Sequence, residues 1–372
     1  MKRLMASLPL RVAMVGTGNV SLRYLRYLPT SPDVVIATLS DIDMDAARMR
    51  AAEFGVGRAC PMEEAVSDPG IDIVLNLTPP AAHAIVTRAA LESGKHVYSE
   101  KPLAMSLDEG RGLVALADEM GCRLACAPDT ILAPHLMTGR ALIDGGAIGT
   151  PVAASCSFVT PGSELWHPSP EFFYQPGAGP VFDEGPYFLS ALVTLLGPVA
   201  EVSAKAATFR PERKVEVGPR AGAPIVARTP THVVALLRLA SGVLATLTMS
   251  FEVLGSTQPP LEIYGTSGTL RFPFPGYYGG GLRLGRKHDG PWQVITPDWS
   301  SAPDQDRGVG VEELARAIVS GDRSRMEAPF PLHILDLMET ILRAAETGKN
   351  ETLQTTCDRP APYHPAASAS AA

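Results

Sequence analysis

Short apolar runs alternate with amphipathic stretches over the first 150 residues of the chain. A short apolar run that stands alone predicts a strand, and apolar positions that recur every three or four residues predict a helix. The run from Ile71 to Leu77 is nearly all apolar, which is typical of a strand covered on both faces. The expected strands are Leu10–Val15, Val34–Leu39, Ile71–Leu77, His96–Tyr98 and Arg123–Ala127, and the expected helices are Asn19–Leu28, Met44–Phe54, Ala81–Glu92 and Ser106–Met120. This alternation predicts βαβ units and a parallel sheet.

The pattern changes after Pro151, where strands follow one another with few helices between them. Strands in direct succession favour a mainly antiparallel sheet. The expected strands are Pro151–Val159, Val199–Phe209, His232–Leu239, Val243–Phe251 and Leu261–Tyr264, and the expected helices are Pro186–Leu196, Val311–Ser320 and His333–Thr347.

A length of 372 residues suggests about two domains. The sequence predicts an α/β domain with a parallel sheet over residues 1–128 and an α+β domain over residues 129–358, which includes the C-terminal helices. A tail over residues 359–372 is rich in Pro and Ala, and we expect it to be disordered.

A glycine-rich loop lies between the first strand and the first helix. Gly16 and Gly18 allow a tight turn and a close approach of the backbone to a pyrophosphate, which would rest on Asn19 and Val20 at the helix start. The third glycine of the usual dinucleotide pattern is replaced by Ser21, which is still small. The position of this loop at the start of a βαβ series predicts a dinucleotide site.

Asp41 follows the second strand, 25 positions after the first glycine of that loop (41 − 16 = 25). An acid at this place hydrogen-bonds a ribose 2′-hydroxyl and repels a 2′-phosphate. The alternative is that Asp41 only caps the helix that follows it. We expect NAD as the cofactor in preference to NADP.

Composition and charge exclude several classes of protein. There are 32 basic and 39 acidic residues, so the net charge is −7, which disfavours nucleic acid as a partner. No apolar stretch approaches the roughly 18 residues that a membrane helix needs. The five cysteines are sparse and lack metal-ligand spacing, so we expect reduced thiols, no metal site and a cytoplasmic location.

Two further motifs carry a resemblance to a known family. One is Thr78-Pro79-Pro80 followed by His83, and the other is the segment 94–102, which ends in Glu100-Lys101-Pro102. Together with Gly145–Gly149 and Gly265–Thr269, they resemble the Gfo/Idh/MocA oxidoreductases, which include glucose–fructose oxidoreductase and inositol and sugar dehydrogenases. The resemblance covers nearly the whole chain.

The resemblance implies a Rossmann domain followed by an α+β domain with an open-faced sheet, and a substrate bound between the two domains. It also implies that Lys101 stands beside the nicotinamide and contacts the reacting oxygen. Thr78, Pro79, His83 and Glu100 would belong to the same cofactor site. The sequence agrees with this, because a lysine at the carboxyl edge of a parallel strand lies where such sheets bind ligands.

A second family motif, Asp-x-Gly-x-His-x-x-Asp, is only partly present. Asp183 and Gly185 match it, whereas Tyr187 stands in place of the histidine and Ser190 in place of the last aspartate. The resemblance implies that this helix start supplies catalytic groups. A phenol has an ordinary pKa of about 10, which a neighbouring ammonium lowers, so Tyr187 could move the proton. The alternatives are that Tyr187 packs its helix against the sheet and that Asp183 is a helix-start acid.

Aromatic and polar residues gather before this motif. Trp166, His167 and Tyr174 are expected to form part of a substrate wall, because aromatic faces and planar polar groups suit a sugar. His167 could equally be an exposed loop residue. Asp129, which we also expect to bind the substrate, follows the fifth strand, where many family members carry arginine, and this suggests a neutral, hydroxyl-rich substrate.

The sequence therefore predicts hydride transfer between a sugar or polyol alcohol and NAD. Two alternatives remain open: a redox-neutral enzyme that retains NAD and acts through a ketone, such as in glycoside cleavage or epimerisation, and a non-catalytic cofactor-binding regulator. An antiparallel sheet covered by helices on one face leaves the other face open. We therefore expect a homodimer or homotetramer.

Overall fold

In the computed structural model, residues 7–299 and 307–365 are described, and they form two compact units. The first unit takes its residues from Met1–Leu132, Ser300–Leu335 and Pro360–Ala372, and the second from Ala133–Trp299 and Asp336–Arg359. None of the helices in the described ranges has the length and apolar content that crossing a bilayer requires.

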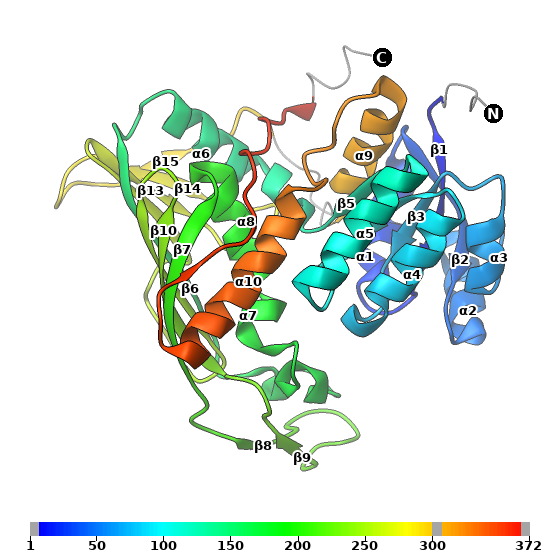
Figure 1. The fold of residues 1–372 in the computed structure, drawn as a ribbon, viewed down its shortest axis with the longest axis horizontal. Coiled ribbons are helices and arrows are strands. Elements are labelled where there is room, and N and C mark those ends of the chain that lie inside the picture. Colours follow the sequence, from blue (N-terminus) through cyan, green and yellow to red (C-terminus); the bar gives the residue numbers. More distant parts are fainter. Residues whose placement is uncertain (1–6, 300–306, 366–372) are drawn as a thin grey trace. The chain divides into compact units, whose positions relative to one another are not determined.

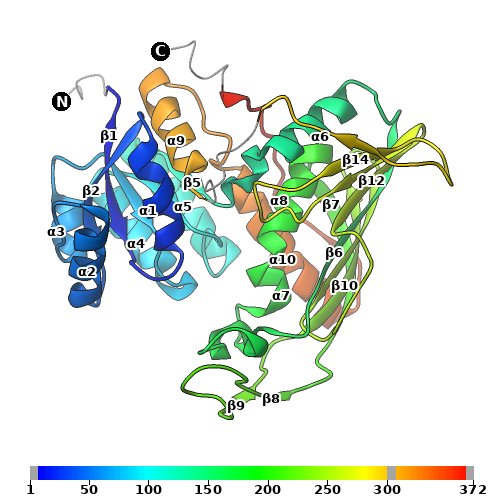
Figure 2. The ribbon, with the colours of Figure 1, turned by 180° about the vertical axis from the view of Figure 1, so that it is seen from behind.

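The first unit is built on a five-stranded parallel sheet with the strand order β2-β1-β3-β4-β5. Its strands are β1 (Leu10–Val15), β2 (Val34–Ser40), β3 (Ile73–Asn76), β4 (His96–Ser99) and β5 (Leu124–Cys126). Its helices are α1 (Ser21–Tyr27), α2 (Met44–Phe54), α3 (Met62–Ser67), α4 (Pro80–Glu92), α5 (Leu107–Met120) and α9 (Val309–Ser320), with short 3-10 turns at Leu28–Thr30 and Asp129–Leu132. Helices α4 and α5 cover one face of the sheet (Figure 1), and α1 covers the other (Figure 2). The Rossmann arrangement predicted from the sequence is confirmed.

Two helix boundaries in this unit follow from local chemistry. The side chain of Ser106 accepts a hydrogen bond from the amide of Glu109, as the capping pattern predicts, and α5 ends at Gly121 in the left-handed conformation. The side chain of Asp43 caps α2 by accepting from two amides of its first turn.

The second unit contains a nine-stranded sheet with the strand order β15-β14-β13-β12-β6-β11-β10-β7-β16, in which only β6 and β11 pair in parallel. Its strands are β6 (Pro151–Val159), β7 (Val199–Ala207), β10 (His232–Leu239), β11 (Leu244–Ser250), β12 (Leu261–Gly265), β13 (Gly268–Phe272), β14 (Leu282–Gly285), β15 (Gln293–Ile295) and β16 (Glu351–Thr352). Its helices are α6 (Pro134–Asp144), α7 (Gly179–Asp183), α8 (Gly185–Leu196) and most of α10 (Phe330–Thr347), with 3-10 turns at Ser163–Leu165 and Glu171–Tyr174. Every residue of α8 is buried. The large, mainly antiparallel sheet predicted from the sequence is confirmed.

The contacts divide the chain differently from the boundaries expected from the sequence. The described part of residues 300–335, which includes α9, belongs to the first unit rather than to a domain over 129–358. Helix α9 packs against β2 and β4, a pairing that sequence order cannot reveal. In the expected tail, Tyr363 is buried, and the carbonyl of Pro362 accepts from Arg325. Residues 366–372 of that tail lie outside the described residues.

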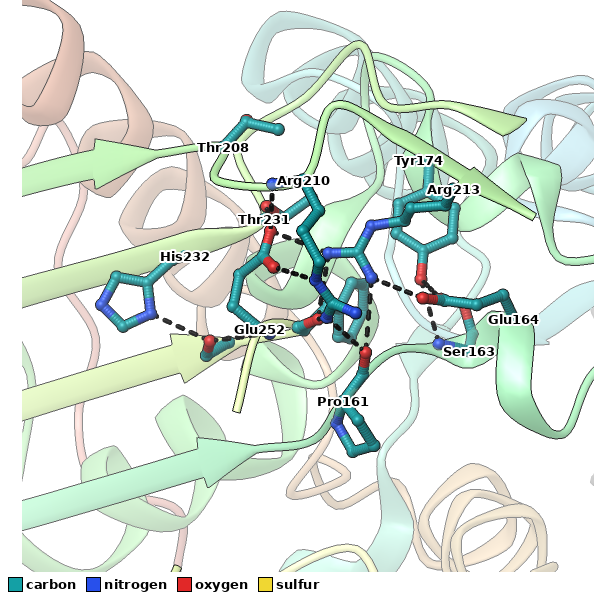
Figure 3. Close-up of polar contacts among 12 residues, drawn as sticks. Pro161, Ser163, Glu164, Tyr174, Thr208, Arg210, Arg213, Thr231, His232 and Glu252 are labelled. Atoms are coloured by element: carbon teal, nitrogen blue, oxygen red, sulfur yellow. Dashed lines mark hydrogen bonds and ion pairs between the residues drawn. The ribbon is translucent and has the colours of Figure 1, made fainter. Parts of the chain in front are cut away.

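A two-stranded hairpin, β8 (Glu212–Lys214) and β9 (Pro224–Val226), is tied to the large sheet by buried ion pairs (Figure 3). Arg213 lies 2.6 Å from a carboxylate oxygen of Glu164 and 2.7 Å from one of Glu252. The three side chains are 2%, 4% and 7% exposed. Arg210 also pairs with Glu252 at 2.7 Å, so two carboxylates face two guanidinium groups. Paired in this way, the charges can be buried without the cost of an isolated buried ion.

This network predicts how the stability of the protein depends on pH. Burial disfavours the charged form of Glu252, but hydrogen bonds from Thr231 and Arg210 and the charge of Arg213 outweigh burial and lower its pKa from 4.5 to about 2. Because the unfolded chain binds this proton more tightly, the contribution of Glu252 to stability is complete above pH 4.5 and is lost as the pH falls toward 2. We expect the free energy of unfolding of Glu252→Gln, measured from pH 6 to pH 2.5, to fall less steeply than that of the wild type.

Glu212→Gln is the matched control, because Glu212 is exposed on β8 of the same hairpin. It should follow the wild-type pH dependence. Parallel curves for the wild type and Glu252→Gln would show that the network does not hold this carboxylate ionised.

Candidate cofactor and substrate site

The loop between β1 and α1 is shaped by two glycines with different tasks. Gly16 has φ of +100°, and a Cβ there would lie 2.6 Å from the backbone carbonyl of Leu77, so only glycine fits. A Cβ on Gly18 would meet nothing within 4 Å. Gly18 and Asn19 are exposed, so the loop offers backbone to a ligand on its open side.

Asp41 lies at the end of β2 and is held by this loop. Its Oδ2 accepts from the amide of Thr17 at 2.6 Å and from the hydroxyl of Thr17 at 2.8 Å, while Oδ1 accepts from the amide of Asp43 at 3.0 Å. Partial burial raises the pKa of Asp41, but these hydrogen bonds outweigh burial and keep that pKa below its ordinary value. The carboxylate is therefore ionised at neutral pH and half-buried beside the loop. The cap of α2 comes from Asp43, so the alternative role for Asp41 is filled by another residue.

Thr17 and Ile42 complete this part of the site, and the sequence analysis did not single them out. Thr17 supplies both hydrogen bonds to Asp41 Oδ2 from the middle of the glycine loop. Ile42 is fully exposed directly after Asp41. Because isoleucine is usually buried, its full exposure directly after a sheet strand marks Ile42 as a candidate for contact with a ligand. This exposure is visible only in the structure.

The loop after β3 is organised by two buried side chains. Asn76 accepts from the amide and the hydroxyl of Thr78 and donates to the carbonyl of His83 at 2.9 Å. The His83 ring is 1% exposed and lies between two carbonyl oxygens, that of Thr78 (2.8 Å from Nε2) and that of Pro102 (2.7 Å from Nδ1). Burial lowers the pKa of His83, although both carbonyl contacts oppose this.

His83 thus connects the loop after β3 to the loop that carries Lys101. Its buried ring contacts the protein at both nitrogens, so the structure gives it a supporting position instead of the direct cofactor contact expected from the sequence. Thr78 is half-buried and Pro79 is exposed at the same loop.

Glu100 and Lys101 follow β4. Glu100 is 6% exposed, and its carboxylate accepts from the amide of Lys101 at 3.0 Å and from the hydroxyl of Tyr24 at 2.9 Å. Glu100 is therefore also a supporting residue, while Lys101 is partly exposed. Tyr24 was missed because a tyrosine on the buried face of a helix indicates core packing, and nothing in the sequence links it to a residue 76 positions away.

Asp129 does not have the exposed position expected of a substrate-binding residue. It is fully buried in the first unit, and its Oδ2 accepts from the amides of Gly308 (2.7 Å) and Gly310 (3.2 Å) at the start of α9. Burial raises the pKa of Asp129, against the opposing charge of Arg307 and these two amides. The carboxylate joins the 3-10 turn after β5 to the start of α9, a contact across 179 residues of sequence.

The motif residues of the second unit lie where two helices meet. Asp183 is the last residue of α7 and is half-buried, and Tyr187 lies in the first turn of α8 with 9% of its surface exposed. The Tyr187 ring packs against Phe274, with their centroids 6.3 Å apart. Because only Glu184 separates α7 from α8, Asp183 and Tyr187 lie at the same helix junction.

The aromatic loop before α7 has an exposed layer and a buried layer. Trp166 is 63% exposed, and the half-buried His167 ring lies 5.3 Å from both the Trp166 and the Phe172 rings. Tyr174 is fully buried, and its hydroxyl binds Glu164 in the ion network (Figure 3). Burial and that hydrogen bond raise the pKa of Tyr174 to about 12. Tyr174 thus supports the loop from within, contrary to its expected place in a substrate wall.

No cluster of three or more His, Cys, Asp or Glu side chains within the described residues could hold a metal ion.

Comparisons with known proteins agree with this division of the chain. A model described as an oxidoreductase family with an NAD-binding Rossmann fold matches residues 10–127, and a model of the GFO/IDH/MocA C-terminal domain matches residues 136–271. The dTDP-3,4-didehydro-2,6-dideoxy-alpha-D-glucose 3-reductase of Streptomyces antibioticus is 32% identical over 277 residues, which is 72% of this chain and 76% of that protein.

Two other relatives extend the comparison. The scyllo-inositol 2-dehydrogenase (NAD(+)) of Bacillus subtilis is 30% identical over 144 residues, which is 38% of this chain and 42% of that enzyme. The solved structure of levoglucosan dehydrogenase in complex with NADH aligns with a TM-score of 0.79 at 19% identity, covering 93% of this chain and 99% of that chain. At this identity the likeness shows the fold alone.

Proposed function

Because this chain belongs to the Gfo/Idh/MocA family of NAD-binding oxidoreductases, we propose that it transfers hydride between NAD and a secondary alcohol of a sugar or polyol. The substrate class is supported by the relatives, which include a reductase of a dTDP-linked sugar and an inositol dehydrogenase. The observation that carries the proposal is the Lys101 peptide, held by Glu100 on one side and by the contact of His83 with Pro102 on the other.

The residues around the glycine loop fit NAD. Gly18 leaves open space for a pyrophosphate against Asn19 and Val20. Asp41, ionised and held by Thr17, is placed to accept from a ribose 2′-hydroxyl and to repel a 2′-phosphate. The exposed Ile42 side chain beside it offers an apolar surface for the adenine. When bound, NAD accepts the hydride from the alcohol carbon.

Thr78, Pro79 and Lys101 are assigned to the nicotinamide end. Lys101 orients the substrate oxygen, and its ammonium stabilises the alkoxide character that develops as the hydroxyl proton leaves. Tyr187 accepts the hydroxyl proton, since it occupies the place of the family histidine. Asp183, at the same helix junction, holds a second hydroxyl of the substrate.

The exposed aromatic surface of Trp166 and His167 is assigned to the substrate. Aromatic faces stack on the C–H faces of sugar rings, and the surrounding polar groups bind hydroxyls. The buried Tyr174 and the ion network beneath keep this surface in place.

We also assign the protein to the cytoplasm as a homodimer or homotetramer. All five cysteines are free and buried, which suits a reducing compartment. On the open face of the large sheet, Val234, Leu236 and Leu244 are 41%, 60% and 59% exposed. They lie on the paired strands β10 and β11, so a second copy of the chain could cover them by the same face.

The cofactor preference depends on Asp41. Asp41→Ala should weaken NAD binding and reduce discrimination against NADP, because the 2′-hydroxyl loses its acceptor and a 2′-phosphate is no longer repelled. Dissociation constants for both cofactors, measured by fluorescence titration, test this. Asp43→Ala is the control: it should cost about 1 kcal/mol of stability through the lost cap and leave the preference unchanged. A wild type that prefers NADP tenfold would contradict the assignment.

The catalytic assignment depends on Tyr187 and Lys101. Removing a general base costs roughly 10²–10⁴ in rate, so Tyr187→Phe should lose that much kcat while NADH binding stays intact, and Lys101→Ala should lose at least as much. Steady-state NADH formation with a panel of sugars, inositols and glycosides provides the assay. Tyr264→Phe, which removes a hydroxyl bonded to Glu262 on β12, is the control and should keep wild-type kcat. Turnover by Tyr187→Phe within twofold of wild type would make Tyr187 a packing residue.

The assembly assignment depends on the open sheet face. Light scattering at micromolar concentration should give a mass of at least twice the 39.4 kDa of one chain. Leu236→Asp should reduce that mass, because a charge would be buried in the interface. Met49→Asp, which changes an exposed methionine on α2, should not. A monomer mass for the wild type would rule the assembly out.

A further inference from the structure

A buried tyrosine contacts the carboxylate that holds Lys101. Tyr24 is fully buried, and its hydroxyl donates to Glu100 Oε1 at 2.9 Å. The other oxygen of the same carboxylate, Oε2, accepts from the backbone amide of Lys101 at 3.0 Å. One carboxylate therefore joins a side chain of α1 to the peptide from which the Lys101 side chain extends.

The backbone of Glu100 is fixed without Tyr24. Its amide donates to the carbonyl of Asn76 at 2.8 Å, and its carbonyl accepts from the hydroxyl of Ser99 at 3.0 Å. The hydrogen bond from the Tyr24 phenol therefore acts on the side chain of Glu100 alone. It favours the conformation in which the Glu100 carboxylate accepts from the Lys101 amide.

Electrostatics keep this phenol a hydrogen-bond donor. Burial and the negative charge of Glu100 raise the pKa of Tyr24 well above its ordinary value, and the buried Arg307 opposes them. Tyr24 therefore stays protonated across the working pH range and donates its hydroxyl hydrogen to Glu100.

Tyr24 also lies close in sequence to the proposed cofactor loop. Helix α1 starts at Ser21, directly after the glycine loop, so Tyr24 is one turn from the proposed pyrophosphate contacts. The His83 ring, on α4, contacts the carbonyl on the other side of Lys101, that of Pro102. Both helices that follow proposed cofactor loops thus contact the Lys101 segment, one through Glu100 and one through His83.

We propose that Tyr24 is a positioning residue for Lys101: through Glu100 it couples the helix behind the cofactor loop to the peptide that carries the lysine. The inference rests on the proposed role of Lys101. It goes beyond that role by assigning the orientation of the lysine to a tyrosine that touches neither cofactor nor substrate.

Tyr27 provides a matched control on the same helix. Its hydroxyl donates to Glu312 Oε2 at 2.8 Å, so it also joins α1 to a largely buried carboxylate. Glu312 belongs to α9, where its carboxylate also lies 3.9 Å from the guanidinium of Arg316. Tyr24→Phe and Tyr27→Phe therefore remove the same kind of bond, and only the first reaches Lys101.

The experiment compares the two variants in kcat, in the NADH dissociation constant and in thermal stability. Misplacement of a catalytic group by about 1 Å costs roughly 10²-fold in rate, so Tyr24→Phe should lose about 10- to 100-fold in kcat. NADH binding should stay within about twofold, and Tyr27→Phe should keep wild-type kcat at a similar loss of melting temperature. Glu100→Gln should behave like Tyr24→Phe, and the double variant should be no worse than either single one, because both act through one contact.

A second readout does not depend on catalysis. Lysines are labelled with ¹³C-methyl groups by reductive methylation, and the Lys101 signal is assigned with Lys101→Arg. Tyr24→Phe and Glu100→Gln should change the chemical shift and pH titration of that signal, whereas Tyr27→Phe should not. A wild type without dehydrogenase activity would contradict the proposed function and leave this readout decisive. An unchanged Lys101 signal in both Tyr24→Phe and Glu100→Gln, or an equal kcat loss in Tyr27→Phe, would overturn the positioning role.

Discussion

Hydrogen bonds from polar side chains to loop peptides hold the carboxyl edge of the Rossmann sheet in one conformation. Each parallel strand there ends in a loop whose amides and carbonyls have left the sheet ladder and need other partners. Asp41 binds the glycine loop, Asn76 binds the loop after β3, and Glu100 binds the amide of Lys101. Asp41 accepts a hydrogen bond from a loop other than its own. Asn76 and Glu100 accept from amides of their own loops and so fix the path of the chain after β3 and β4. The edge is thereby preorganised for a ligand, so less conformational entropy is lost on binding.

Charge burial shapes the second unit in a similar way. The aromatic loop that carries Trp166 is held by the apolar cluster around Phe173 and Tyr174 and by Arg213 with its two carboxylates. A buried ion pair contributes little net stability compared with apolar packing, but it tolerates few geometries. An arrangement of this kind specifies where the exposed aromatic side chains stand, which matters more for a binding surface than additional stability would.

The elements predicted well from the sequence are those whose partners lie close in the chain. The strands of the Rossmann sheet and helix α2 follow from apolar periodicity and from capping residues that act locally. Helix α6 was not predicted, because Gly139 and Arg140 interrupt its apolar positions in the sequence, although both are buried in the fold. Gly139 there packs directly against the ring of Phe272, with which an added Cβ would collide. Strands β8 and β9 are three residues each and give too little pattern to recognise.

The sequence by itself determined the fold class, the dinucleotide loop with Asp41, and the motif around Lys101, because turn geometry and strand-end chemistry are local properties of a few adjacent residues. Only the tertiary structure decided what the buried polar residues do. Asp129 caps a helix 179 positions away, Tyr174 joins an ion network, and Tyr24 reaches Glu100 across 76 positions. A carboxylate or phenol has the same chemistry in a ligand site and in a core. Its role depends on whether the fold supplies a hydrogen-bond donor from another part of the chain or leaves the group open to water or a ligand.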